Sequence, residues 1–254
     1  MSMEQFLIDW TKYQLTVKSD RGDLTVKWSD VETLAKWSNI QAGLYLQETN
    51  SLQTFFEHFP RWYQGWWNQR HGMGCYDLPD GAVIVDVGSG IAVQDLLLYS
   101  YIPNSKFYLL DKQGFEFRPG IFYDPNYPCY HNWEVVHDAI RSSGFDASRF
   151  STLNETDPWP EQVDCVTSYL SWGWHYPKET YWQKTLDSLK IGGKLVMDLR
   201  VLPDKDIVAE ITEDMKSEPT LFPFDKKLPR HIDNLAPPEG SPVSGYRAVW
   251  TRKA

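Results

Sequence analysis

A continuous apolar run that ends in glycines constrains the fold of this 254-residue chain more than any other segment. It spans residues 82–90 and reads AVIVDVGSG. Apolar, β-branched residues on both faces of a short run are typical of a strand buried in a parallel sheet. Gly88 and Gly90 then allow a sharp turn and let a ligand approach bare backbone. Because residues 91–101 follow with helical spacing, the segment predicts a strand–turn–helix unit with a ligand at its turn.

Strand and helix patterns alternate along the rest of the chain. Further strands are predicted at residues 106–111, 149–154, 163–170 and 194–200, and helices at residues 132–144, 180–190 and 204–215. Gly144 is expected to end the first of these helices, and Ile191–Gly193 the second. The alternating tail at 245–253 predicts a final edge strand. The whole pattern predicts an α/β fold with a doubly wound, mainly parallel, Rossmann-like sheet.

The first 80 residues have a different character, mixed and mainly helical. Ser29 and Asp30 precede a helical pattern and predict a capped helix. A second helix is predicted from Ser51 to about residue 58, because Pro60 interrupts the pattern there. We therefore expect an N-terminal helical addition at residues 1–80, acting as a lid or substrate region, and a ligand-binding domain at residues 81–254.

Charge and cysteine content exclude several classes of partner and compartment. The net charge of −9 and the pI of about 5.1 argue against nucleic acid and anionic membranes, which bind basic surfaces. Three cysteines without C-x-x-C spacing exclude a disulfide framework and a four-cysteine zinc site. We find no signal peptide and no stretch of about 18 apolar residues, so a cytoplasmic protein is expected. The oligomeric state is not readable from the sequence.

The residues around the glycine turn discriminate between two classes of nucleotide cofactor. A dinucleotide enzyme needs a small third residue at position 93, where this chain has Val93. Asp86, two residues before Gly88, is unsuited to a pyrophosphate but suited to a cationic group such as an ammonium. Asp111 ends the next strand, about 20 residues further on, where a carboxylate accepts hydrogen bonds from ribose hydroxyls. These residues argue against a nicotinamide dinucleotide.

The motifs D-V-G-S-G-x-A, L-L-D and G-G-K, in this order, resemble those of class I S-adenosylmethionine (SAM)-dependent methyltransferases. The resemblance covers roughly residues 81–201, and the tail would supply the last two strands of a seven-stranded sheet. It implies SAM as the cofactor. The sequence departs from the family pattern at Ala92, where the family most often has a third glycine.

The resemblance also implies a set of cofactor-binding residues. Gly88, Ser89 and Gly90 would line the methionine end of SAM, with Asp86 beneath them. The remaining residues are Asp111 for the ribose, Lys112 beside the adenine edge and Asn154 for the adenine amino group, where the family more often has Asp. The alternative is a plain tight turn with helix-capping carboxylates, and for Asn154 an ordinary turn residue.

The segment after the fourth predicted strand, residues 168–177, is expected to face the acceptor. It lacks the Asn/Asp-Pro-Pro-Tyr/Phe box that grips a flipped base, which argues against nucleic-acid methylation. His175 is the candidate base that removes a proton from a hydroxyl acceptor, although a capping or core histidine is an equal alternative. Tyr176, Tyr169 and His131 are lesser candidates, and the loop at 114–130 is a candidate lid.

Two tryptophans in this segment point to the kind of acceptor. Trp172 and Trp174 flank Gly173, and indole faces pack on sugar C–H surfaces. The run S-W-G-W-H-Y-P is similar to one in sugar O-methyltransferases, which implies a sugar or another small hydroxylated acceptor bound by Trp172, Trp174, Tyr176 and His131. The alternative is that the tryptophans pack N-terminal helices onto the sheet. No paired metal ligands follow the fourth strand, so we expect no metal.

Two other functions stay open on the sequence alone. One is an N- or carboxyl-methyltransferase acting on a small molecule or a protein, which needs no strong base. The other is a catalytically silent SAM-binding domain that contacts a partner chain through its aromatic N-terminal region.

Overall fold

The structure is a computed structural model that describes residues 14–30, 34, 52–112, 133–173, 177–200, 205–223 and 245–254. The strands of the main sheet are β3 (Val83–Val87), β4 (Lys106–Leu110), β5 (Phe150–Leu153), β6 (Val163–Ser168), β7 (Leu189–Arg200), β8 (Thr220–Pro223) and β9 (Gly245–Thr251). The helices are α3 (Leu52–Gly72), α4 (Val93–Tyr101), α5 (Trp133–Ser142), α6 (Glu179–Ser188) and α7 (Ile207–Met215), with a short 3₁₀ helix at Ala147–Arg149.

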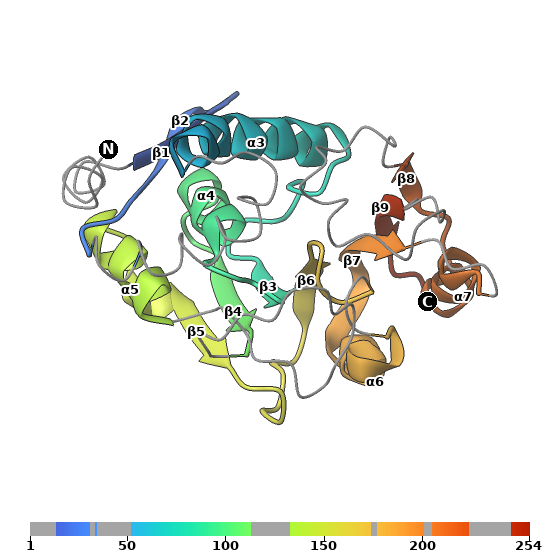
Figure 1. Cartoon of the computed structure of the whole chain (residues 1–254). Coiled ribbons are helices and arrows are strands. Elements are labelled where there is room, and N and C mark those ends of the chain that lie inside the picture. The colour runs from blue at the N-terminus through green and yellow to red at the C-terminus, as the bar shows by residue number, and fades with distance from the viewer. Residues whose placement is uncertain are drawn as a thin grey trace.

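The main sheet has seven strands in the order β5–β4–β3–β6–β7–β9–β8 (Figure 1). Strands β3 to β7 are parallel, whereas β9 is antiparallel to both of its neighbours, β7 and β8. The predicted α/β, doubly wound, mainly parallel seven-stranded sheet is therefore confirmed. β3 pairs with β4 on one side and β6 on the other, so the strand order reverses at β3 and ligands are expected beyond its carboxyl end.

Helices cover both faces of the sheet and bury two separate hydrophobic cores. The first core joins α3, α4 and α5 to one face, and the second core joins α6 and α7 to the other. Figure 1 shows α4 and α5 beside β3, β4 and β5, with α6 and α7 near β7. Successive residues of β3 alternate between the cores, Ile84 in the first and Val85 in the second, as the period of a strand requires.

A β-hairpin in the N-terminal region was not predicted. β1 (Gln14–Ser19) pairs antiparallel with β2 (Gly22–Lys27) through a two-residue turn at 20–21, and Gly22, whose φ is +109°, begins β2. Four alternating side chains of the hairpin join the first core: Leu15, Val17, Leu24 and Val26. The hairpin packs against α3, α4 and α5 (Figure 1). The described N-terminal residues therefore share a core with the sheet, and their role as a lid stays a prediction.

Helix α3 corrects the expectation that a helix ends before Pro60. It runs continuously from Leu52 to Gly72. A proline removes one backbone hydrogen bond, but packing of the following turns, with Trp67 buried in the first core, stabilises the continued helix. Of the helix predicted after Ser29 and Asp30, only Leu34 is described, and its N–H donates to the Asp30 carbonyl at 3.2 Å. The rest lies outside the described residues.

Two strand predictions are also corrected. β7 begins at Leu189 and includes Gly192 and Gly193, which were expected to lie between the helix and the strand. Leu189 already pairs with Val163 of β6, so the glycines form part of the sheet. β9 lies between β7 and β8 and is not an edge strand, because β8 adds to its other side. Gly144, with a φ of +70°, follows α5 as predicted. Among the described residues, no helix is long and apolar enough to cross a membrane.

Candidate functional site

Three hydrogen bonds join the turn after β3 to the end of β4, and a fourth holds the Asp111 carboxylate in place. The N–H groups of Gly88 and Ser89 donate to the Leu110 carbonyl at 2.7 and 3.2 Å. The Gly90 N–H donates to one oxygen of the Asp111 carboxylate, and the Lys112 N–H to the other, both at 2.7 Å. The structure thus brings together Gly88, Ser89, Gly90 and Asp111, at the strand-order reversal where the sequence placed them.

The backbone of this turn explains its glycines. Gly88 and Gly90 have φ angles of +77° and +56°, which a residue with a side chain adopts only with strain. Ala92 is the residue before α4 and has a φ of 53°, also left-handed. The methyltransferases that the sequence resembles most often have a third glycine at this position. Here an alanine adopts the left-handed conformation, with the strain that a Cβ adds. Val93 begins α4 and is buried, leaving no small residue there for a pyrophosphate.

Asp86 lies in a buried polar pair and does not extend freely from the strand end. The Thr167 hydroxyl of β6 donates to its Oδ1 at 2.7 Å. Burial raises the pKa of Asp86 and, more strongly, that of Asp95 on α4, where the neighbouring Asp86 carboxyl raises the pKa further. The pair is therefore suited to sharing a proton. Its role toward a cationic ligand stays a prediction, and sequence reasoning missed Asp95.

The two residues predicted to contact adenine have other contacts in the structure. Lys112 forms an ion pair with Glu155 at 3.1 Å. The backbone N–H and side-chain amide of Asn154 donate to Asp157 Oδ2 at 2.7 and 3.1 Å, and Asn154 is exposed. These are the contacts expected of a turn residue. Lys112 follows β4 and Asn154 follows β5, so both lie at the carboxyl ends of strands on the same side of β3 as Asp111.

Trp172 closes the base of the segment after β6. Its backbone N–H donates to the Ser168 hydroxyl at 2.8 Å, and that hydroxyl donates to the Val87 carbonyl of β3 at 2.8 Å. The indole N–H of Trp172 is shared by the carbonyls of Pro177 and Lys178, at 3.2 and 2.9 Å. The ring has no exposed surface and packs with α6 in the second core. What the structure shows of Trp172 is therefore a packing and loop-closing role.

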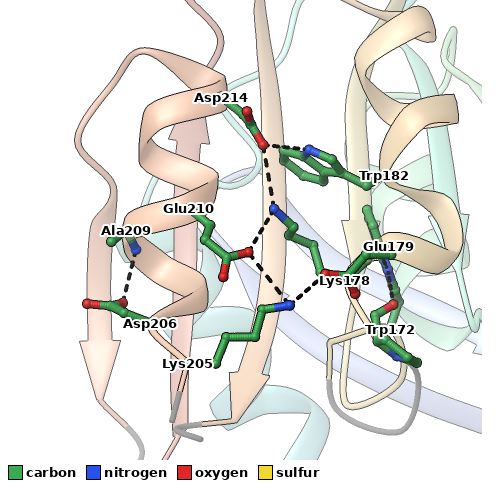
Figure 2. Close-up of polar contacts among 10 residues, drawn as sticks. Trp172, Lys178, Glu179, Trp182, Lys205, Asp206, Ala209, Glu210 and Asp214 are labelled. Atoms are coloured by element: carbon green, nitrogen blue, oxygen red, sulfur yellow. Dashed lines mark hydrogen bonds and ion pairs between the residues drawn. The ribbon is translucent and has the colours of Figure 1, made fainter.

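Lys178 anchors the other end of the same segment to α7 (Figure 2). Its buried ammonium lies 3.0 Å from Glu210 and 3.5 Å from Asp214, and 4.9 Å from the centre of the Trp182 ring. The Trp182 indole N–H donates to the same Asp214 oxygen at 2.7 Å. These contacts tie the start of α6 to α7 and fix where the segment rejoins the fold.

Four predicted site residues lie outside the described residues: Trp174, His175, Tyr176 and His131. The candidate lid at 114–130 lies outside them too. Their roles as base, acceptor contacts and lid stay predictions.

Charged and polar side chains gather on the α3 side of the sheet, toward the carboxyl ends of the parallel strands. Along β6, buried Cys165 is followed on the same face by Thr167 and then Tyr169. Along β7, Val196 is followed by Asp198, whose carboxylate accepts two hydrogen bonds from Arg247 of β9 at 2.7 and 2.8 Å. Sequence reasoning missed this cluster, although a charged residue in an apolar strand pattern signals a buried partner.

Arg70 of α3 completes the cluster. Its guanidinium carbon lies 3.4 Å from the centre of the Tyr169 ring, and the side chain is 1% exposed. Burial raises the pKa of Tyr169 well above its usual value. In the described part of the chain, no group of three potential metal ligands is found.

Comparisons with known proteins give similar folds but no family. No protein-family model and no curated protein matches the sequence. Precorrin-6y C5,15-methyltransferase from Geobacter metallireducens is 16% identical, with 72% of this chain and 85% of that chain covered and a TM-score of 0.45. An rRNA methylase from Streptococcus thermophilus is 14% identical, with coverages of 73% and 95% and a TM-score of 0.44. M. jannaschii TYW2 in complex with AdoMet is 12% identical, with coverages of 72% and 73% and a TM-score of 0.48.

Proposed function

We propose that this protein is a SAM-dependent methyltransferase that methylates a hydroxyl group of a small acceptor, a sugar or a similar hydroxylated compound. The observation that carries the proposal is the hydrogen bond from the Gly90 N–H to Asp111, which joins a glycine turn and a carboxylate at the strand-order reversal. A doubly wound sheet binds nucleotides at this point.

The residues at this edge fit SAM better than a dinucleotide. The turn at Gly88 and Gly90 leaves bare backbone, and the Ser89 hydroxyl is buried with no hydrogen-bond partner among the described residues. Asp111 accepts two backbone hydrogen bonds and directly follows β4, where a doubly wound sheet places the carboxylate that accepts from ribose hydroxyls. Val93 in place of a small residue argues against NAD.

Each residue of the proposed site has a distinct task. Asp111 orients the ribose, the Gly88–Gly90 backbone contacts the methionine end, and Lys112 lies beside the adenine. Bound SAM would supply an electrophilic methyl group on a sulfonium. His175 takes the proton from the acceptor hydroxyl, and Trp174, Tyr176 and His131 contact the acceptor. The site would hold the acceptor oxygen in line with the methyl group and the sulfur, the geometry that this displacement requires.

The proposal is tested first by cofactor binding. S-adenosylhomocysteine should raise the melting temperature of the wild-type protein, and NAD should not. Asp111→Asn keeps the size of the side chain but loses its charge, so this variant should bind S-adenosylhomocysteine at least about tenfold more weakly, the value of one lost charged hydrogen bond. Asp146→Asn, at an exposed 3₁₀-helix cap far from the turn, is the matched control. No binding by the wild type would refute the proposal.

Turnover then separates the enzyme from a silent domain. His175→Ala should keep S-adenosylhomocysteine binding and lose methyl transfer to a panel of sugars and phenols. A wild-type protein that binds S-adenosylhomocysteine but transfers methyl to no acceptor would favour a silent SAM-binding domain. Full activity of His175→Ala, with a flat pH profile through the histidine range, would favour N- or carboxyl-methylation.

A further inference from the structure

Arg70 carries buried hydrogen-bond donors that the described residues leave unused. It lies near the end of α3, is 1% exposed, and stacks on the Tyr169 ring. Its Nε and Nη1 atoms have no hydrogen-bond partner in the described part of the chain. An arginine stays protonated in proteins, so it cannot escape the cost of burial by losing its proton. A buried cation with unused donors is costly unless something else binds it.

The nearest carboxylates are already engaged by other groups. Asp198, across the cluster, is held by the two hydrogen bonds from Arg247. Asp86 accepts from Thr167 and pairs with Asp95, whose own pKa is raised by burial. Among the described residues, no carboxylate lies within ion-pair distance of Arg70. The protein has a net charge of −9, so carboxylates outnumber cations in the chain, yet none forms an ion pair with Arg70 among the described residues.

Arg70 lies on the side of the site where the acceptor is expected to bind, away from the proposed cofactor residues. The proposed cofactor residues Gly88, Gly90 and Asp111 follow β3 and β4. Arg70 instead stacks on Tyr169, directly after β6, near the Asp198–Arg247 pair that joins β7 and β9. In a doubly wound sheet both groups of residues face the same crevice from opposite sides of the reversal.

We propose that Arg70 binds an anionic group, a carboxylate or a phosphate, of the acceptor. The acceptor is then a hydroxylated compound that also carries a negative charge, such as an acidic or phosphorylated sugar, and not a neutral sugar. The assignment to an acceptor rests on the proposed function, whereas anion binding by Arg70 does not. Arginine is suited to this because its planar donors match carboxylate and phosphate oxygens.

The test compares matched ligands that differ in one charged group. Glucuronate, glucose 6-phosphate, acetate and inorganic phosphate are titrated at constant ionic strength, with glucose as the neutral control. At ten times its Kd, an anion bound at Arg70 should raise the melting temperature of the wild type by about 3–6 °C. Glucose should give no shift. Arg70→Met should abolish the anion effect, and Arg70→Lys should retain part of it.

Stability without ligand excludes a merely structural role for Arg70. Arg70→Met removes an unpaired buried cation, so its melting temperature without anions should equal or exceed that of the wild type. If Arg70 only stabilised the fold, Arg70→Met would have a lower melting temperature than the wild type. If no anion stabilises the wild type, or if Arg70→Met responds equally, the proposal is wrong.

A cofactor arm separates this result from the proposed function. S-adenosylhomocysteine should bind wild type and Arg70→Met with equal affinity. If Arg70→Met weakens S-adenosylhomocysteine but not 5′-methylthioadenosine, which lacks the amino-acid end, the anion is the cofactor carboxylate and the assignment to the acceptor is wrong. Binding of S-adenosylhomocysteine without any anion effect would overturn the inference and leave the proposed function intact.

Discussion

Gly88 is the position at which the turn after β3 meets the segment after β6, and Gly88→Ala tests that contact. A Cβ added at Gly88 would lie 1.9 Å from Ser171 Oγ and 2.3 Å from Ser171 Cβ. Its φ of +77° adds backbone strain. Gly90 is a matched control, because its φ is +56° but an added Cβ meets nothing within 4 Å.

The expected costs follow from these two terms. Left-handed strain costs about 1–2 kcal/mol for a residue with a Cβ, and overpacking adds about 1–3 kcal/mol. Gly88→Ala should therefore destabilise the protein by about 2–5 kcal/mol, and Gly90→Ala by about 1–2 kcal/mol. Ser171→Gly removes both clashing atoms and leaves only Ser171 Cα at an ordinary 3.8 Å. In that background, Gly88→Ala should cost no more than Gly90→Ala.

Urea unfolding of the single and double variants measures this difference as a double-mutant cycle. We expect a coupling free energy of about 1–3 kcal/mol between Gly88→Ala and Ser171→Gly. Gly90→Ala and Ser171→Gly should instead be additive within about 0.5 kcal/mol. A Gly88–Ser171 coupling below that limit would show that the two segments do not touch in solution, and the close approach of the β6 segment to the turn would be wrong.

Three further predictions concern stability. Lys178→Met should cost about 1–2 kcal/mol in urea unfolding, less than for a fully buried pair because Glu210 is 39% exposed, and high salt should reduce the difference. Asp138 is buried, which raises its pKa, but hydrogen bonds from residues 29, 30 and 142 outweigh burial and lower it. Asp138→Asn should therefore cost about 2 kcal/mol at pH 7, and the difference should shrink as the pH falls through about 4, the unfolded pKa of Asp; an unchanged difference at pH 3 would contradict this. For Asp95, burial raises the folded pKa, so the folded state binds an extra proton and stability should fall as the pH rises above about 4. Asp95→Asn should flatten that decline in thermal unfolding scans, and a profile unchanged from wild type would count against the shared proton.

The parts of the fold that local pattern predicted are those with a strong period and a clear turn. β3, α4 and the glycine turn combine an apolar run, glycines and helical spacing within 20 residues, so their structure follows from neighbours in sequence. The hairpin of β1 and β2 had a comparable signal, with Leu15, Val17, Leu24 and Val26 alternating around a turn before Gly22, and its alternation should have outweighed the helical reading. The helix was predicted to end before Pro60 because local propensity takes no account of how the later turns pack against the rest of the fold.

In the candidate site too, residues related by local spacing were predicted, and residues brought together by long-range packing were not. Asp111 was predicted because its distance from the glycine turn along the chain is fixed by one strand–helix–strand unit. Arg70, Asp95 and the Asp198–Arg247 pair were not predicted, because they meet only through long-range packing. Arg247 and Asp198 are 49 residues apart, and no local spacing relates them. A charged residue in an apolar strand predicts a partner, but not which one.

The two faces of the sheet hold different groups of charged residues. On the α6–α7 side, Trp172 and Lys178 fix both ends of the segment after β6 through packing and ion pairs. On the α3 side, Asp86 and the Asp198–Arg247 pair lie toward the carboxyl ends of the strands, with Arg70 of α3 nearby. Because Lys178 and Arg70 lie on opposite faces of the sheet, Lys178→Met should lower stability without changing anion binding, and Arg70→Met should abolish anion binding without lowering stability. A variant that shifted both equally would mean that the faces are energetically coupled.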